Sequence, residues 1–221
     1  MSRTSIDTAT RPVRLDIAGV ALNGDLSLPL DAHGFVLFAH GSGSSRRSSR
    51  NRAVAEVLQR AHLGTLLLDL LTEREELVDV TTAEFRFDIP LLADRVVAAL
   101  DWAKKDPRTS TLSLGVFGAS TGAAAALIAA ATRPAIVRAV VSRGGRPDLA
   151  EAALDVVTAP TLLIVGGRDD MVIELNRQAF ARLKAPKELA IVPGATHLFE
   201  EPGALDQVSR LATDWFVRHL E

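Results

Sequence analysis

LSLGVFGASTG at Leu112–Gly122, together with the AAAALIAAA that follows at Ala123–Ala131, is the stretch that decides the fold. The apolar run Leu112–Phe117 predicts a buried strand, and the alanine-rich run predicts a helix. Between them stands G-x-S-x-G with Ser120 at its centre, typical of a strand-to-helix turn that exposes a nucleophilic serine. The glycines have a physical reason, because side chains two residues either side of the serine would collide at so tight a turn. The N-terminus of the predicted helix also favours negative charge beside the Ser120 hydroxyl.

A five-residue motif is a weak signal, because a serine can occupy a glycine-rich turn in any doubly wound fold. The composition of the chain limits which classes of protein it can belong to. The chain has 221 residues, 48% of them hydrophobic, no cysteine and a formal net charge of −2. It can bury one substantial core and has no Gly-, Ser- or Pro-rich linker, so we expect a single domain over residues 1–221. The charge argues against a nucleic-acid partner, and the lack of cysteine excludes disulfides and thiolate metal sites. No run is long enough to span a membrane and no secretory signal opens the sequence, so we expect no membrane partner and a cytoplasmic location.

Apolar runs of strand length alternate with helical periodicity along most of the chain. Continuous apolar strands predict an α/β fold with a mostly parallel sheet covered on both faces, where ligands bind at the carboxyl ends of strands. An antiparallel hairpin, Val13–Ile17 and Val20–Ser27 around an Ala18-Gly19 turn, is expected before it. Further strands are expected at Phe35–Ala39, Thr65–Leu71, Leu112–Phe117, Val137–Val141, Thr161–Val165 and Glu188–Val192, and helices at Asn51–Ala61, Ile89–Ala103, Ala123–Ala131, Pro147–Leu154, Val172–Leu183 and Ala204–Leu220.

Three residues that follow predicted strands form a candidate catalytic set. Ser120, Asp169 and His197 occur in the order Ser, Asp, His, each just after a strand. Serine needs a neighbouring base, neutral histidine can accept its proton, and a carboxylate can orient the imidazole. Asp170 competes with Asp169 for the last role, and either could instead cap the following helix.

A tetrahedral intermediate also needs two N–H donors for its oxyanion. The Thr121 amide, one residue after the serine, is the natural first donor, and Ser42 in the loop His40–Gly43 is the expected second. His40 is expected to order this loop rather than to act as the base. The remaining histidines, His33, His62 and His219, lie beside a turn, at a helix end and near the C-terminus.

Four motifs together resemble an α/β-hydrolase of the dienelactone-hydrolase-like kind: HGSG at His40–Gly43, GASTG around Ser120, GGRDD around Asp169 and GATH at Gly194–His197. The resemblance spans nearly the whole chain. It implies a sheet of about eight strands, no large cap domain, no cofactor, and hydrolysis of an ester, lactone or thioester. Dienelactone hydrolases themselves use a cysteine nucleophile, so the resemblance does not identify a dienelactone as the substrate here.

Arginines gather near the same strand ends, above all Arg46 after the HGSG loop and Arg143 after Val137–Val141. The guanidinium fork matches carboxylate and phosphate, so the small-molecule substrate could be an anionic ester. The alternative is that these arginines are solvated or pair with nearby acidic residues, namely Glu73, Glu75, Glu76 and Glu84. The acidic stretch Thr72–Glu84 is expected to be a mobile rim that could cover the pocket.

Other functions stay open. An acyltransferase would use the same three residues with another nucleophile in place of water, and a ligand-binding module could keep the fold without turnover. A metal hydrolase is disfavoured, because the histidines are scattered with no H-E-x-x-H spacing. A dinucleotide-binding oxidoreductase is also disfavoured, because no complete G-x-G-x-x-G follows the first buried strand.

Overall fold

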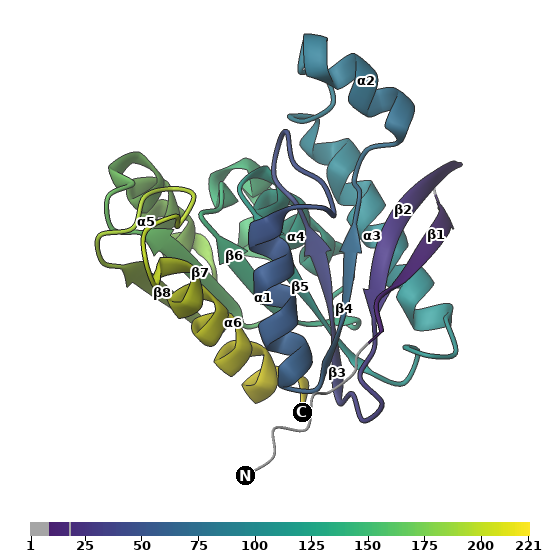
Figure 1. Cartoon of the computed structure of the whole chain (residues 1–221). Helices are drawn as coiled ribbons and strands as arrows, with labels where there is room; N and C mark the ends of the chain where they lie inside the picture. The colour runs from purple at the N-terminus through teal and green to yellow at the C-terminus, as the bar shows by residue number, and fades with distance from the viewer. Residues whose placement is uncertain (1–8, 18) are drawn as a thin grey trace.

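An eight-stranded sheet runs through the molecule in the order β1-β2-β4-β3-β5-β6-β7-β8 (Figure 1). The structure is a computed structural model that describes residues 9–17 and 19–221. β2 lies antiparallel between β1 and β4, and the other described pairings are parallel. The predicted sheet with its N-terminal hairpin is therefore confirmed, although Ala18 of the predicted turn lies outside the described residues. The strands are β1 (Arg11–Ile17), β2 (Val20–Ser27), β3 (Gly34–Ala39), β4 (Leu63–Leu68), β5 (Ser113–Ala119), β6 (Val137–Arg143), β7 (Thr161–Gly166) and β8 (Lys187–Val192).

Helices cover both faces of the sheet, which is why the central strands are apolar on both sides. α1 and α6 lie together on one face, where Trp215 and Phe216 of α6 belong to the same buried cluster as Phe38 and Phe117 of the sheet. The other face is covered by α3, α4, α5 and the 3₁₀ segment η1. The helical elements are α1 (Ser49–Arg60), α2 (Glu73–Thr82), α3 (Ile89–Lys105), α4 (Thr121–Thr132), η1 (Pro147–Asp155), α5 (Asp170–Arg182) and α6 (Ala204–Leu220).

The sheet order places a topological switch point between β3 and β5. From β3 the chain crosses to β4 on one side, and it then returns to β5 on the other side of β3. The loops after these two neighbouring strands therefore leave in opposite directions, and such a switch point is where open α/β sheets bind their ligands. Ser120 follows β5, and the His40–Gly43 loop follows β3. Topology alone thus brings both segments to one place.

Most element ends differ from the sequence-based expectation by no more than two residues, and two elements differ further. β4 ends at Leu68 rather than Leu71, which leaves Asp69 beyond the strand. The stretch expected to be a mobile rim contains the helix α2, which projects from the rest of the molecule (Figure 1). Thr72 begins it with a capping box, in which the Thr72 hydroxyl accepts from the Glu75 N–H and the Glu75 carboxylate accepts from the Thr72 N–H. Asp79 is its only fully buried residue, so little apolar periodicity marks it as a helix.

Candidate active site

Ser120 stands on the sharp turn between β5 and α4, at the carboxyl end of a central strand. Its backbone angles, φ 51° and ψ −122°, lie in a region that residues with side chains rarely occupy, so the turn is strained. A Cβ on Gly118 would collide with the backbone of α4, and one on Gly122 would collide with carbonyl oxygens at the end of β3. The glycine spacing read from the sequence therefore has the steric cause expected of it.

An imidazole and a carboxylate pair at the carboxyl ends of β7 and β8. His197 Nδ1 lies 2.7 Å from Asp169 Oδ2. Asp169 occupies the N-cap position of α5 but its side chain makes no capping hydrogen bond, so the carboxylate is available to the imidazole. Asp170, the alternative, is the exposed first residue of α5. An ionised carboxylate only accepts hydrogen bonds, so His197 carries its hydrogen on Nδ1 and keeps Nε2 as a proton acceptor.

Ser120 and His197 both pack against the end of β6. The Ser120 N–H donates to the Arg143 carbonyl oxygen at 3.3 Å. A Cβ on the next residue, Gly144, would lie 3.6 Å from His197 Cε1, the ring carbon between the two nitrogens. The imidazole edge is therefore beside the turn that carries Ser120. Within the described residues no hydrogen bond joins the Ser120 hydroxyl to the ring, and such bonds are often long before substrate binds.

Hydrogen bonds fix the orientation of the Gly41–Ser42 peptide in the loop after β3. His40 Nδ1–H donates to the Gly41 carbonyl oxygen at 2.9 Å, and the Ser44 N–H donates to the same oxygen at 3.2 Å. The Leu70 N–H donates to His40 Nε2 at 2.9 Å. In a trans peptide the N–H points opposite to the C=O, so holding the Gly41 carbonyl also sets the direction of the Ser42 N–H. Burial lowers the pKa of His40, which keeps the ring neutral and both of its hydrogen bonds in place.

The two residues expected to stabilise an oxyanion flank the elbow. Gly41, next to Ser42, approaches the serine so closely that a Cβ there would lie 2.8 Å from the Ser120 Cβ. Thr121 is the first residue of α4, so its N–H has no carbonyl one turn earlier in the helix to bond. Backbone N–H groups from the loop after β3 and from the start of α4 therefore lie near Ser120.

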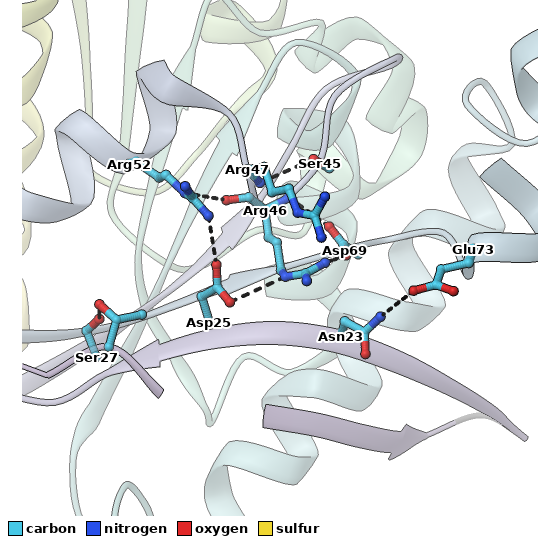
Figure 2. A network of polar contacts seen from close by, with 10 residues as sticks. Asn23, Asp25, Ser27, Ser45, Arg46, Arg47, Arg52, Asp69 and Glu73 are labelled. Atoms are coloured by element: carbon cyan, nitrogen blue, oxygen red, sulfur yellow. Dashed lines mark hydrogen bonds and ion pairs between the residues drawn. The ribbon is translucent and has the colours of Figure 1, made fainter. Parts of the chain in front are cut away.

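Arg46, expected to bind substrate, is occupied by carboxylates in a network that Figure 2 shows. Its guanidinium pairs with Asp69 and, through Nε at 3.3 Å, with Asp25 Oδ1. The Arg46 N–H also donates to Asp69 Oδ1 at 2.7 Å, and Arg52 Nη2 reaches Asp25 Oδ2 at 3.1 Å. The carboxylates come from β2 and the end of β4, not from the glutamates of Thr72–Glu84. The network ties the segment after the HGSG loop to β2 and to the end of β4.

A small cavity of about 80 Å³ lies between the HGSG loop and α2. Arg86 is held at its wall by Asp79, with Nε 2.7 Å from Asp79 Oδ2 and Nη1 directed toward Gly43. α2 therefore supplies one wall of the cavity beside the elbow. The lining residues are His40, Gly41, Ser42, Gly43, Ser44, Ser45, Asp69, Leu71, Glu76, Asp79, Val80, Arg86 and Leu92.

Arg143, the second arginine expected to bind substrate, is a buried cation. Its residue is 5% exposed, and its Nη2 donates to Asn51 Oδ1 at 2.8 Å. Its guanidinium carbon lies 6.0 Å from the centre of the Phe199 ring, two residues beyond His197. Burial, with a smaller contribution from the nearby Arg50, lowers the pKa of Arg143 to about 10, so it stays charged at neutral pH.

Sequence reasoning missed Asp69, Asp25 and Asn51. Asp69 had a usable signal, because it is the polar residue in TLLLDLL and directly follows a strand that ends at Leu68. Asp25 sits inside a strand and Asn51 inside a helix, so neither position is distinguished by its place in the sequence. Their partners are far along the chain, and only the fold brings them together.

Neither a membrane-spanning helix nor a metal-type cluster occurs in the part of the chain that the structure describes. No helix there combines the length and apolar character needed to cross a bilayer. No three His, Asp or Glu side chains gather there as they would around a metal ion.

The chain is similar to proteins described as dienelactone hydrolases and esterases. Residues 71–219 match the model of the dienelactone hydrolase family. A dienelactone hydrolase from Anabaena variabilis, solved by crystallography, is 57% identical, with a TM-score of 0.96 over 97% of this chain and 99% of that one. The Pyrococcus furiosus esterase Pf2001 is 18% identical, with a TM-score of 0.77 over 100% of this chain and 97% of that one, which shows a shared fold alone.

A longer relative has a different name. A Mycobacterium tuberculosis protein, provisionally named a phosphoribosyl transferase, is 55% identical over 222 aligned residues. The match takes in 98% of this chain, which spans about half, 49%, of that relative. The family model matches more than half of the chain, and the 57% identical Anabaena protein is described as a dienelactone hydrolase: the chain belongs to the dienelactone hydrolase family.

Proposed function

We propose that this chain is a serine hydrolase that cleaves a carboxylic ester, lactone or thioester through an acyl-enzyme on Ser120. The observation that carries the proposal is the 2.7 Å contact between Asp169 and His197, beside a strained turn that exposes a serine. Serine hydrolases on several unrelated folds use a hydroxyl, an imidazole and a carboxylate together. In this chain each of the three follows a different strand, which supports the proposal.

Each residue has one task. Ser120 Oγ attacks the acyl carbonyl carbon while its proton passes to His197 Nε2, and the carbonyl oxygen becomes an oxyanion. The Ser42 and Thr121 N–H groups stabilise that oxyanion, each by roughly 3 kcal/mol. The imidazolium, held by Asp169, then gives its proton to the departing alcohol or thiol. Water repeats the sequence on the acyl-enzyme and releases the acid.

Two other functions remain to be separated from this one. In an acyltransferase a second nucleophile takes the place of water in the last step, and in a binding module Ser120 does not react. The name of the mycobacterial relative suggests a third, but the chain matches only half of that protein. No specific observation in this chain therefore favours the phosphoribosyl transferase activity that the relative's name suggests.

A fluorophosphonate probe tests the proposal, because it phosphonylates only an activated serine. We expect labelling of the folded protein at Ser120, established by peptide mass, and none in Ser120→Ala or after heat denaturation. Ser49→Ala, which removes an exposed serine at the start of α1, is the matched control and should label normally. Unlabelled native protein would favour the binding module over an enzyme.

Partition of the acyl group then distinguishes hydrolase from transferase. A set of p-nitrophenyl and thioester substrates, followed with and without added alcohol or hydroxylamine, measures how much acyl group goes to water. Predominant release of acid supports a hydrolase. Efficient transfer to the added nucleophile at low concentration would instead identify an acyltransferase.

A further inference from the structure

The glycine loop, residues 144–146, and the last residue of β6 hold the Ser120 backbone on both sides. The Ser120 N–H donates to the Arg143 carbonyl oxygen at 3.3 Å, and the Ser120 carbonyl oxygen accepts from the Arg146 N–H at 3.0 Å. Ser120 has unfavourable backbone angles, and a residue keeps such angles only where its surroundings define its position. The position of the strained turn therefore depends on where the glycine loop lies.

The glycine loop also contacts the segment that carries the imidazole. A Cβ on Gly144 would lie 3.6 Å from His197 Cε1 and 3.1 Å from the His197 carbonyl oxygen. A Cβ on Gly145 would lie 2.6 Å from the Cβ of Ala123, so the loop also packs tightly against α4, the helix that begins after Ser120. Because the loop touches both segments, a shift of the loop would change how the hydroxyl faces the ring.

A buried amide fixes the glycine loop to α5. Asn176 is fully buried, and its Nδ2 donates to the Gly145 carbonyl oxygen at 3.0 Å and to the Val172 carbonyl oxygen at 2.8 Å. An amide nitrogen carries two hydrogens, so both are used, and the opposite orientation of the amide would place its oxygen against two carbonyl oxygens. α5 begins directly after Asp169. Asn176 therefore connects the helix next to the proposed acid with the loop that holds the Ser120 backbone.

Packing alone does not explain an asparagine at this position. Its Oδ1 is buried without a hydrogen-bond partner among the described residues. A buried acceptor without a donor lowers stability, and an apolar side chain of similar size would avoid that loss. The residue type is better explained by what its two N–H groups hold.

We propose that Asn176 is a positioning residue, which holds the glycine loop so that the Ser120 hydroxyl stays aligned with the His197 imidazole. This inference rests on the proposed role of Ser120 as the nucleophile. Asn176 acts through the Gly145 carbonyl and the neighbouring Arg146 N–H rather than by touching substrate. A misplacement of reacting groups by about 1 Å can slow a reaction by about 10²-fold. Loss of the amide should therefore slow the attack by Ser120 and leave binding of a neutral ester unchanged.

Asn176→Leu tests the proposal, because leucine has a similar shape and no side-chain N–H groups. Thr109→Val is the matched control, since it removes a buried hydroxyl that donates to the Ala103 carbonyl oxygen at 2.7 Å. Thr109 lies between α3 and β5, at the end of β5 opposite to Ser120. Both variants lose a buried donor to a main-chain carbonyl and should lose stability in urea unfolding. Only Asn176→Leu should lower kcat on a neutral p-nitrophenyl ester, by about 10–100-fold, with KM changed by less than about twofold.

The rate of fluorophosphonate labelling separates positioning from stability. It is measured at a temperature at which circular dichroism shows each variant to be folded, and it reports the reactivity of Ser120 without binding of an ester. We expect the second-order labelling rate constant of Asn176→Leu to fall in parallel with kcat, by about 10–100-fold, and that of Thr109→Val to stay near wild type. Wild-type labelling and kcat in folded Asn176→Leu, or equal losses in the two variants, would overturn the positioning role. If Asn176→Leu does not fold, Asn176→Asp takes its place, because it keeps the shape of the side chain and offers at most one hydrogen.

A measurement on wild type makes the test independent of the variants. In NMR the side-chain amide hydrogens of Asn176 should exchange with solvent at least about 100-fold more slowly than those of Gln178, an exposed amide on the same helix. Equally fast exchange would show that the bonds to Gly145 and Val172 do not persist, and would overturn the proposal. Failure of the proposed function looks different: wild-type Ser120 would not label at all, although the Asn176 hydrogens were still protected.

Discussion

The Arg46–Asp69 ion pair holds the segment that follows the HGSG loop, and removing it tests how this segment is kept in place. The side chains are 18% and 13% exposed, and Asp69 also accepts the Arg46 backbone N–H. Charge-assisted hydrogen bonds of this kind contribute about 1.5–3 kcal/mol. Asp25 still compensates Arg46 when Asp69 is neutralised, so we expect Asp69→Asn to lower the free energy of unfolding toward the smaller of these values.

A double-mutant cycle isolates the pair. Urea unfolding of wild type, Arg46→Met, Asp69→Asn and the double variant should give a coupling energy of about 1–2 kcal/mol. The exposed pair Arg14–Asp16, with side chains 72% and 83% exposed, is the control and should couple weakly. A coupling energy for Arg46–Asp69 as small as that of the control pair would refute the reasoning.

Activity provides a second measurement on the same variants. Asp69 fixes the segment that follows Ser42, and loss of one oxyanion donor lowers kcat by roughly 10²–10³-fold. If the Ser42 N–H is the oxyanion donor proposed above, Asp69→Asn loosens that donor without removing it. We then expect kcat on a neutral ester to fall by about 10–100-fold with KM little changed. Unchanged kcat despite the loss of stability would show that the network supports the fold but not the oxyanion site.

Three further outcomes are expected. Burial lowers the pKa of His40, so at a pH below the ordinary value of 6.5 the unfolded chain binds a proton that the folded chain does not. The free energy of unfolding therefore falls as the pH falls, by at most about 1.4 kcal/mol per pH unit. Urea unfolding at pH 7.5 and 5.5 should therefore show a flatter pH dependence in His40→Gln, and equal slopes would contradict this. Asp169→Asn should lower kcat by up to roughly 10⁴-fold in steady-state assays while the far-ultraviolet spectrum stays native, and a loss below tenfold would remove Asp169 from its role. Gly122→Ala should lower the free energy of unfolding by about 1–3 kcal/mol through overpacking against β3, and a neutral effect in urea unfolding would contradict that collision.

The sequence was most informative at positions where the structure allows only one kind of residue. Gly118 and Gly122 predicted the elbow because only glycine fits there, and the long apolar strands predicted the parallel sheet because both of their faces are buried. It was least informative for α2, whose large apolar residues Leu77 and Val80 are 77% and 72% exposed. A helix that packs so little against the core leaves a weak periodicity, and only its capping box marks its start.

The sequence was also uninformative about which charged side chains form ion pairs. The arginines near the strand ends could be counted in the sequence, but which of them are neutralised depends on partners distant in the chain. Arg46 meets Asp25 and Asp69 only after β2 and β4 have paired, whereas Arg143 meets the amide of Asn51. The pairing of strands, not local composition, therefore decides which cation is left over.

The positive φ of Ser120 is unfavourable for stability at the residue that the proposed reaction needs. Glycine would relieve about 1–3 kcal/mol of backbone strain there and would abolish the hydroxyl. A laboratory selection for heat resistance alone would therefore favour glycine at this position and would recover stable proteins that lack the proposed nucleophile. Improvement of this chain for use at high temperature has to be sought elsewhere, with turnover kept under selection at every round.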